Sequence, residues 1–353
     1  MKLTINAHTY TAEQIISLLN EKRSTSINIW ENDLFKFLKD WFDNSDVIQA
    51  QTSGSTGIPK TIFLSKSSMI ASARLTNQYF GLNNNDTILL CLSTNYIAGK
   101  MMVVRALVGN LNLVVIEPSS CPIVNQAIDF AAMVPMQVET MLNSTTGRAS
   151  LDNISKLIIG GSAVSNLLES KLQSISTACF ATYGMTETVS HIALRSLNGQ
   201  NRSNEYQALE GVWFEQDDRE CLIIHAPHIN NKELITNDIV RLKSKSTFEW
   251  CGRFDNVINS GGIKLFPEML ENKIAPCIEQ RFFISSKKDE LLGDKAILVI
   301  EGESFSAVAL QNLKVKIGTL LISPYEIPRE IVFMPKFEET SSGKVKRVLL
   351  NLL

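Results

Sequence analysis

Residues 88–116 read ILLCLSTNYIAGKMMVVRALVGNLNLVVI, the most apolar stretch of the chain. Asn95, Lys100, Arg105 and Asn110 interrupt it. Because charged side chains are costly inside a bilayer, these interruptions argue against a membrane-spanning helix. Two short apolar runs, 88–92 and 113–116, instead flank a segment of helical spacing at 98–108. The stretch predicts a buried strand, a helix and a second buried strand.

The alternation of short apolar runs with helical segments extends over about residues 46–190. Further strands are expected at 156–159 and 178–182. Further helices are expected at 65–79 and 165–175, each opening with a serine that can cap free backbone N–H groups. Strands that alternate with helices favour a largely parallel sheet. The expected fold class is α/β, with parallel sheets flanked by helices.

The pattern changes in the last third of the chain. Short alternating runs between residues 211 and 250 predict a small β subdomain. Two strands and a helix are expected beyond it, at 281–285, 295–301 and 307–320. About a hundred residues suffice for a compact domain. We expect an N-terminal domain of residues 1–253 and a small, mobile α+β domain of residues 254–353.

Charge and cysteine usage exclude several classes of protein. The 34 basic and 36 acidic residues leave a net charge of −2, without a basic block that would bind nucleic acid. The six cysteines form no C-x-x-C pair, which argues against a disulfide framework or a zinc knuckle. Residues 1–15 lack the apolar run of a secretory signal. These features predict a cytoplasmic protein without integral membrane segments or nucleic-acid partners.

Hydroxyls, glycines and a lysine crowd the segment TSGSTGIPK at residues 52–60. Glycines let backbone N–H groups approach an anion, hydroxyls donate further hydrogen bonds, and Lys60 adds a positive charge. A solvated surface turn is the common alternative for isolated glycines and serines. A Walker loop requires glycine directly before its lysine, where this chain has Pro59. The segment predicts a phosphate-binding loop of another type.

Two further motifs come directly after expected strands, where parallel sheets bind ligands. GGS occupies residues 160–162 and YGMTE occupies residues 183–187. In isolation, Tyr183 would be read as a half-buried aromatic and Glu187 as a solvated acid at a helix start. Their places at strand ends favour a ligand-binding role.

Two motifs lie near the expected domain boundary. TND occupies residues 236–238, and a left-handed turn would tolerate Asn237 at its centre. GRFDNVINSGGIK occupies residues 252–264. Arg253 and Asp255 could form a weak surface ion pair. Their position between regions of different composition favours a hinge.

The last motif, SSGKVKR, occupies residues 341–347. A lysine in a polar segment is usually solvated, and the basic neighbours Lys346 and Arg347 have no motif of their own. Lys344 therefore gains its meaning from the whole set of motifs. In order and content, that set resembles the adenylate-forming enzymes, which include acyl-CoA synthetases, adenylation domains of peptide synthetases and luciferases.

The resemblance implies a complete set of residues for the phosphates of ATP. The loop residues of this set are Thr52, Ser53, Gly54, Ser55, Thr56, Gly57 and Lys60. Thr186 would contact the α-phosphate, and Glu187 would hold Mg²⁺, a hard cation that prefers carboxylate oxygens. Lys344 would bridge the acyl carboxylate and the phosphate.

The resemblance also implies a nucleoside site and a conformational step. Gly161 and Ser162 would border the adenine, and Tyr183 would lie against its ring. Asp238 would accept hydrogen bonds from the ribose hydroxyls and Arg253 would meet the ribose. Asp255 would be the hinge, and Gly261 and Gly262 would line the path of the thiol. After adenylation, rotation about this hinge would bring the glycine-rich segment to the thiol of coenzyme A.

The implied chemistry is the attack of a carboxylate on the α-phosphorus of Mg·ATP, followed by transfer of the acyl group to coenzyme A. Stabilisation of the phosphate charge is the main catalytic task. No side chain has to act as a covalent nucleophile. Retention of both Glu187 and Lys344 argues against a non-catalytic nucleotide-binding relative.

The acyl substrate is less directly encoded. The family's Pro-Leu-Phe-His pattern is STNY here, at residues 93–96, so the acyl pocket does not transfer directly. Lys100 interrupts an apolar helix and is the preferred partner for a second carboxylate, because buried cations need compensation. Arg105 is expected to reach solvent or to pair with an acidic neighbour. Tyr96 and His191 are further candidates beside the acyl pocket.

The phosphate loop begins unusually early, and the resemblance covers roughly residues 47–347, with the front of the family fold shortened. This short front resembles compact o-succinylbenzoate–CoA ligases of menaquinone biosynthesis. A ligase for another aryl or acyl acid and a domain that loads a carrier protein stay open as alternatives. The oligomeric state also stays open, and a homo-oligomer is compatible with the sequence.

Overall fold

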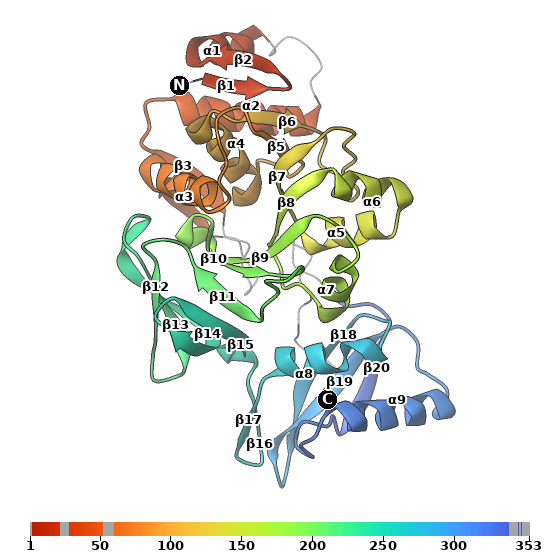
Figure 1. Ribbon diagram of the computed structural model, residues 1–353. Helices are drawn as coiled ribbons and strands as arrows, with labels where there is room; N and C mark the ends of the chain where they lie inside the picture. The colour runs from red at the N-terminus through yellow and green to blue at the C-terminus, as the bar shows by residue number, and fades with distance from the viewer. Residues whose placement is uncertain (1, 22–27, 52–59, 339–344, 346, 348–353) are drawn as a thin grey trace. The chain divides into compact units, whose positions relative to one another are not determined.

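The computed structural model describes residues 2–21, 28–51, 60–338, 345 and 347 (Figure 1). The described chain forms two compact units. The first unit comprises residues 1–164, 168–213 and 225–233, and the second comprises residues 165–167, 214–224 and 234–353. No helix in these described ranges combines the length and apolarity needed to cross a membrane. The division into residues 1–253 and 254–353 stays a prediction.

A long mixed sheet forms the centre of the first unit. Within this unit its strand order is β11-β10-β9-β8-β7-β5-β6-β1-β2. The strands are β1 (Lys2–Ile5), β2 (His8–Thr11), β5 (Thr87–Leu90), β6 (Asn112–Val115), β7 (Ile128–Met133), β8 (Ile154–Ile159), β9 (Ala178–Gly184), β10 (His191–Ser196) and β11 (Glu205–Ala208). All neighbours from β1 to β9 in this order are parallel, whereas β2, β10 and β11 pair antiparallel. The parallel strands therefore end at one common edge.

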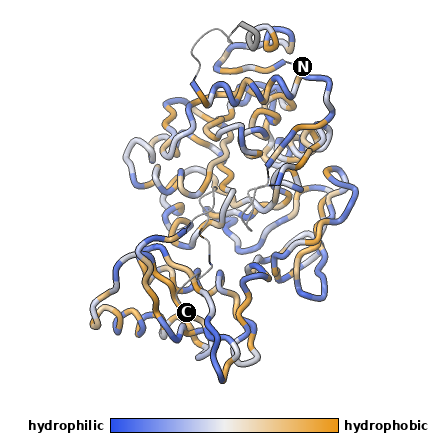
Figure 2. Tube along the Cα trace, turned by 180° about the vertical axis from the view of Figure 1, so that it is seen from behind, coloured by the Kyte–Doolittle hydropathy of each residue, from blue (hydrophilic) through white to orange (hydrophobic). Residues whose placement is uncertain are grey.

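Helices cover both faces of this sheet (Figure 1). The helices α3 (Lys66–Tyr79) and α4 (Ile97–Gly109) lie on one face. The helices α5 (Pro135–Leu142), α6 (Thr145–Asp152) and α7 (Asn166–Leu172) lie on the other. Leu89, Val138 and Leu157 belong to a fully buried cluster on this second face. Burial of each such side chain contributes about 2 kcal/mol to the free energy of unfolding. Figure 2 shows the apolar residues along the strands of the unit.

The N-terminal region adds two helices and a hairpin. These elements are α1 (Ala12–Glu21), α2 (Ile29–Phe42), β3 (Val47–Gln51) and β4 (Thr61–Ser65). Buried residues recur along α2 with helical spacing, at Leu34, Phe37, Leu38 and Trp41. The antiparallel pair β3–β4 flanks the predicted phosphate loop. Residues 52–59 of that loop lie outside the described residues.

The second unit contains the greater part of the strand series β12-β13-β14-β15. Its second sheet has the order β17-β16-β19-β18, with β20 paired to β19. The strands are β12 (Trp213–Gln216), β13 (Cys221–Ala226), β14 (Asn230–Ser244), β15 (Thr247–Arg253), β16 (Ile258–Ser260), β17 (Ile263–Leu265), β18 (Phe282–Asp289), β19 (Gly293–Glu301) and β20 (Glu330–Met334). The helices α8 (Pro267–Ile274) and α9 (Ala307–Leu320) pack against the second sheet through Leu270, Ile274 and Leu313.

The α/β fold class is confirmed, and so are the strand, helix and strand expected within residues 88–116. Ser65 caps α3 as expected, because its hydroxyl accepts the N–H of Ser68 at 3.0 Å. The left-handed turn expected at Asn237 is wrong. This residue lies inside β14 with extended backbone, so the asparagine needs no special conformation.

Candidate functional site

Two predicted motifs of the first unit lie at adjacent strand ends. Gly160 and Gly161 follow β8, and the turn that contains Thr186 follows β9. β8 and β9 are parallel neighbours, with Ile159 opposite Ala181, so both motifs lie at the carboxyl edge of the sheet. This is the edge at which open α/β sheets bind ligands.

Close packing explains the two glycines after β8. A Cβ atom at Gly160 would overlap the side chain of Thr182 on β9. Gly161 has φ +84°, a backbone conformation that side chains other than glycine rarely adopt. Gly161 and Ser162 are both exposed.

The turn after β9 is held by hydrogen bonds of a buried threonine. The Oγ1 atom of Thr188 accepts the N–H of Met185 at 2.9 Å and lies 2.8 Å from the carbonyl oxygen of Ser190. Within this turn Thr186 is buried and the Glu187 carboxylate is exposed. The structure therefore exposes the Glu187 side chain just after the end of β9 and buries its neighbour Thr186.

Val189 has strained backbone at the end of the same turn. Its φ is +67° and its ψ is −53°, and the N–H of Ser190 donates to the carbonyl oxygen of Thr188 at 2.7 Å. This is a γ-turn of the rare, strained kind, and a β-branched residue at positive φ is an outlier. Strain of this kind collects at functional sites, which supports a functional role for the turn.

Replacement of Thr188 with valine is expected to lower the free energy of unfolding by about 1–3 kcal/mol. The isosteric change leaves the Met185 N–H and the Ser190 carbonyl without their hydroxyl partner. Urea unfolding measures the effect. The matched control is Thr140→Val, which removes an exposed hydroxyl contact to Met136 and should change stability by less than about 0.5 kcal/mol. Equal effects of the two variants would contradict this role.

A buried cation lies beside this turn. The Arg105 side chain is 1% exposed and donates from Nη2 to the Oγ atom of Ser190 at 2.8 Å. Its Nη1 atom contacts the Met102 sulfur at 3.4 Å, and its guanidinium lies 5.9 Å from the centre of the Phe130 ring. Nε is buried and has no partner within the described ranges. The expectation that Arg105 reaches solvent or an acidic neighbour is wrong.

Burial has a clear electrostatic consequence at this position. Loss of hydration lowers the pKa of Arg105 to about 9, and the side chain still carries its charge at neutral pH. The neighbouring His191 is also buried. Its burial is the main cause of a pKa well below the usual value, and the positive charge of Arg105 lowers it further. His191 is therefore a neutral ring, within 3.3 Å of the Thr76 hydroxyl.

The other two candidates for the acyl substrate lie on or next to α4. Lys100 is half-buried and donates from Nζ to the carbonyl oxygen of Gln49 at 2.7 Å. Its ammonium also lies 5.8 Å from the centre of the Phe37 ring, and burial lowers its pKa. Tyr96 precedes α4 and is 62% exposed. Lys100 thus has protein partners of its own, whereas Arg105 has no anionic one among the residues described.

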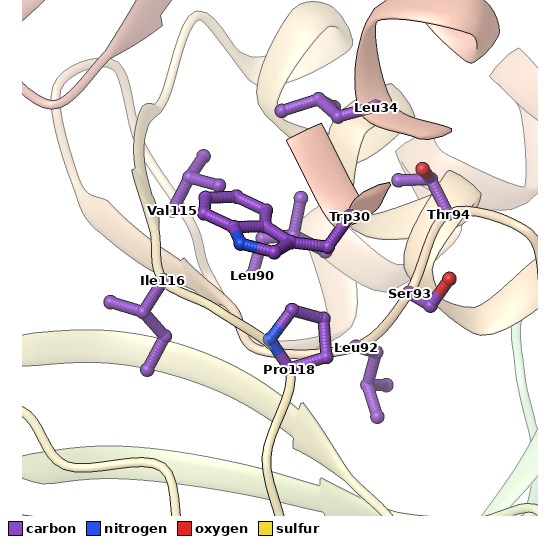
Figure 3. A pocket seen from close by; sticks show the side chains of 9 residues that line it. All are labelled: Trp30, Leu34, Leu90, Leu92, Ser93, Thr94, Val115, Ile116 and Pro118. Atoms are coloured by element: carbon purple, nitrogen blue, oxygen red, sulfur yellow. The ribbon is translucent and has the colours of Figure 1, made fainter. Parts of the chain in front are cut away.

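A small cavity opens at the carboxyl ends of β5 and β6 (Figure 3). Nine residues line it: Trp30, Leu34, Leu90, Leu92, Ser93, Thr94, Val115, Ile116 and Pro118. Its volume of about 10 Å³ suits a single water molecule. The indole Nε1 of Trp30 and the hydroxyl of Thr94 are buried there without a partner in the described chain. The cavity is too small for an organic acid.

The ribose candidates of the second unit lie on paired strands. Asp238 on β14 lies opposite Arg253 on β15, and Nη1 of Arg253 is 3.3 Å from the aspartate Oδ1. The indole of Trp250 donates to the same oxygen at 3.3 Å. Nη2 of Arg253 also reaches Asp255 at 3.1 Å. The structure therefore joins the predicted ribose pair to the predicted hinge residue.

The predicted glycine-rich segment forms the tight connection between β16 and β17. Gly261 and Gly262 have φ +57° and +81°. A Cβ atom at Gly261 would overlap the ring of Tyr325, so only glycine fits there. Of the remaining predicted residues, Lys60 is exposed directly before β4, whereas Thr52, Ser53, Gly54, Ser55, Thr56, Gly57 and Lys344 lie outside the described residues.

Sequence reasoning missed Ser190 and the burial of Arg105. Ser190 had no motif signal, because its role comes from the strained turn that precedes it. For Arg105, a usable signal was its place between Val103, Val104, Ala106 and Leu107, all of which are buried in the structure. A cation surrounded by apolar neighbours on every side of a helix has no short route to solvent.

Comparisons with known proteins identify the family of the chain. The pattern of the family described as "AMP-binding enzyme" matches residues 12–210, and so begins well before residue 47. A 2-succinylbenzoate–CoA ligase of Lactococcus lactis is 23% identical over 94% of this chain and 77% of its own. The O-succinylbenzoate coenzyme A synthetase of Bacillus subtilis, solved in complex with ATP and magnesium ion, is 19% identical. It has a TM-score of 0.69 over 85% of this chain and 68% of its own, a likeness of fold alone.

A solved protein from Dyadobacter fermentans is more similar in sequence. It is described as an acyl-CoA synthetase (AMP-forming)/AMP-acid ligase II-like protein. It is 34% identical, with a TM-score of 0.63 over 94% of this chain and 96% of that one. The chain therefore belongs to the AMP-binding, adenylate-forming enzymes, within their AMP-forming acid–CoA ligases.

Proposed function

We propose that this chain activates a carboxylic acid with ATP and transfers the acyl group to coenzyme A, with o-succinylbenzoate as its acid. In the first step, a carboxylate oxygen attacks the α-phosphorus of ATP and pyrophosphate leaves. In the second, the sulfur of coenzyme A attacks the acyl carbon and AMP leaves with the electrons of the broken C–O bond. Family membership supports the reaction class, and the buried Arg105 supports the choice of acid.

ATP and Mg²⁺ suit the residues at the strand ends of the first unit. Mg²⁺ usually takes one or two carboxylates and completes its shell with water and substrate phosphates. Glu187 offers one exposed carboxylate. Nowhere in the described chain do three or more His, Cys, Asp or Glu side chains gather into a ligand set, so an ion here would need phosphate oxygens. When bound, such an ion would neutralise charge on the nucleotide.

The protein groups would divide the remaining tasks. The hydroxyl of Thr186 and the loop of residues 52–60 would hold the phosphates through hydrogen bonds. Lys344 would hold the acyl carboxylate against the α-phosphorus, with its positive charge at the oxygens that become more negative. Asp238, already oriented by Arg253 and Trp250, would accept hydrogen bonds from the ribose. Residues 254–353 would move about Asp255 between the two steps.

The choice of acid depends on Arg105. A buried charge without a counter-ion is costly, and proteins retain one where an anionic ligand completes the pair. Arg105 contacts Ser190, which follows the turn that carries Thr186 and Glu187. An acid with a second carboxylate would supply the missing anion, whereas a fatty acid would leave the guanidinium unpaired. o-Succinylbenzoate has two carboxylates, and ligases named for this acid are among the relatives.

An ATP-dependent assay of pyrophosphate and thioester formation tests the proposal. The acids to compare are o-succinylbenzoate, benzoate and medium-chain fatty acids, with the free thiol of coenzyme A as acceptor. We expect turnover with o-succinylbenzoate to exceed that with either monocarboxylate by at least tenfold in kcat/KM. Preference for a fatty acid would refute the substrate but keep the reaction class. Adenylate formed without any thioester would favour a carrier-protein acceptor.

The reaction suits a cytoplasmic enzyme, which we propose this chain to be. All six cysteines are free thiols, and four of them are buried. Such thiols persist where the environment keeps them reduced.

A further inference from the structure

The Glu169 carboxylate on α7 holds two arginines. Its Oε2 atom lies 2.9 Å from Nη1 of Arg195 on β10, and its Oε1 atom lies 2.8 Å from Nε of Arg202. The side chains of Glu169 and Arg195 are 3% and 11% exposed, whereas that of Arg202 is 48% exposed. A buried pair is held more firmly than a surface pair, because little water competes for its hydrogen bonds. Arg195 is therefore the fixed partner of this carboxylate.

Arg195 also contacts an aromatic side chain on the neighbouring strand. Its guanidinium carbon lies 5.8 Å from the centre of the Tyr206 ring on β11, and its side chain is hydrogen-bonded to the Tyr206 hydroxyl. Nη1 of the arginine donates to the carbonyl oxygen of Ser203 at 3.0 Å as well. Burial raises the pKa of Tyr206, although the charge and the hydrogen bond of Arg195 oppose this rise. The phenol is therefore neutral at physiological pH, and the guanidinium orients it.

Tyr206 in turn contacts Tyr183 on β9. The ring centres are 5.8 Å apart and the ring planes meet at 60°, close to the edge-to-face geometry that aromatic pairs prefer. The strands β9, β10 and β11 lie side by side in the sheet, with β10 in the middle (Figure 1). Ala193 on β10 lies opposite Tyr183, and Ala208 on β11 lies opposite Ala193. Because Ala193 has only a methyl group with which to hold the Tyr183 ring, Tyr206 provides the aromatic contact.

These side chains lie on one face of the sheet. Alternate residues of a strand point to the same face, so Tyr183, Arg195 and Tyr206 share a face. Helix α7 covers that face, and its Leu168 belongs to the apolar cluster against which Tyr206 packs. The contacts therefore form a continuous path that begins at Glu169 on α7 and ends at Tyr183 on β9.

The path ends at the predicted base site. Tyr183 is half-buried at the carboxyl end of β9, and the family resemblance implies that its ring lies against the adenine. We propose that Arg195, through Tyr206, is a positioning residue that holds the Tyr183 ring in the orientation in which it stacks on the base of ATP. A ring held before the ligand arrives loses less freedom on binding, so the nucleotide binds more tightly. This inference rests on the proposed binding of ATP at the strand ends of the first unit.

The base of the nucleotide separates this role from a general structural one. ATP and ribose 5-triphosphate share the sugar and the phosphates, but only ATP has a base to stack. Stacking on an aromatic side chain strengthens binding by about 5- to 150-fold per base. Arg195→Met is expected to raise the Kd of ATP by about five- to tenfold, because the Tyr183 ring is kept but is no longer held. Isothermal titration calorimetry of the whole chain with each ligand and Mg²⁺ measures the effect.

The other quantities should be unaffected. The Kd of ribose 5-triphosphate and kcat for adenylation at saturating ATP should each stay within about twofold, because the phosphates bind through groups that Arg195 does not contact. The matched control is Arg202→Met, which removes the exposed arginine from the same carboxylate and leaves the contact between Arg195 and Tyr206 in place. This control should leave both Kd values unchanged.

Two further variants test the path itself. Tyr206→Leu should reproduce the selective loss, and the double variant with Arg195→Met should bind ATP no more weakly than Tyr206→Leu, because both changes act through one ring contact. If Arg195→Met does not fold, Arg195→Lys is measured instead. It keeps a positive charge beside Glu169 and should show a smaller loss with the same preference for the ligand that has a base.

Equal weakening of both ligands, an equal effect of Arg202→Met, additive losses in the double variant or an unchanged Kd of ATP would each overturn the inference. The unmodified protein is measured in parallel. If it bound ATP no more tightly than ribose 5-triphosphate, the base would have no stacking partner, and the inference would fail while the proposed reaction stood. If it bound ATP selectively but formed no acyl-adenylate, the proposed function would fail and the inference would stand. Absence of ATP binding would overturn both.

Discussion

Replacing Lys344 with alanine is expected to slow acyl-adenylate formation by about 100- to 1000-fold, the usual effect of removing one group that stabilises charge in the transition state. The lysine would neutralise negative charge that grows on the phosphate while the carboxylate attacks. It would also hold two anions together that otherwise repel each other. Pyrophosphate release under single-turnover conditions measures the step, because later steps then have no influence.

The chain offers a close control for this variant. Lys346 is two residues away and has the same charge, so Lys346→Ala reports what loss of a nearby positive charge does by itself. We expect its effect to stay within about threefold, since a charge that contacts neither the acid nor the nucleotide acts only through a field that salt screens. Thioester formation from supplied acyl-adenylate should be normal in both variants. A Lys344→Ala enzyme with an unchanged adenylation rate would refute the assignment.

Replacing Arg105 with methionine is expected to lower kcat/KM for o-succinylbenzoate by about 100-fold. Removal of one partner from a buried charge pair typically costs about 3 kcal/mol, and each 1.4 kcal/mol corresponds to a tenfold change. In the benzamide analogue of o-succinylbenzoate, a neutral carboxamide replaces the benzoate carboxylate. The kcat/KM for this analogue should therefore change much less. The measurement is therefore the ratio of the two kcat/KM values in the variant and the unmodified protein.

Arg105→Met should lower activity but should not lower the stability of the fold. Arg105 carries a charge at 1% exposure without an anionic partner in the described chain, so an apolar side chain of similar length should suit its place as well or better. We expect Arg105→Met to keep or raise the free energy of unfolding in the absence of substrate. A variant that is both strongly destabilised and unchanged in its choice of acid would show that Arg105 has a purely structural role.

Lys100→Met completes this experiment, because Lys100 was the preferred cation on sequence grounds. Its ammonium donates to the Gln49 carbonyl oxygen at 2.7 Å, and a carboxylate would have to compete with that bond. We expect the smaller change in acid preference from this variant. A larger effect than that of Arg105→Met would indicate that Lys100, and not Arg105, binds the second carboxylate of the acid.

The strands and helices of the sheet could be predicted because their signals are local. The helix at residues 307–320 has the bounds that its apolar spacing indicated, and the strands at 156–159 and 178–182 needed only small extensions. The strand β7 (Ile128–Met133) went unrecognised, although it lies between β5 and β8 in the sheet. Its short apolar run has the same composition as a buried helix segment, and periodicity cannot separate the two.

The sequence by itself determined the family and the order of its motifs. Glycines, hydroxyls and a lysine in a fixed order predict a phosphate-binding loop, because the backbone and side-chain groups that would bind the anion are neighbours in the chain. Strand ends that alternate with helices imply one common edge for the ligand. Such information lies in neighbouring residues, and it can therefore be read directly from the chain.

Only the tertiary structure decided which groups each cation contacts. Lys100 and Arg105 lie on one helix and have similar neighbours in sequence, yet the first meets the Gln49 carbonyl and the second meets Ser190. Arg347 likewise meets Glu271, a residue of α8 that lies 76 positions earlier in the chain. Burial and charge pairing depend on segments far apart in the chain, because side-chain free energies are set by surroundings that only folding brings together.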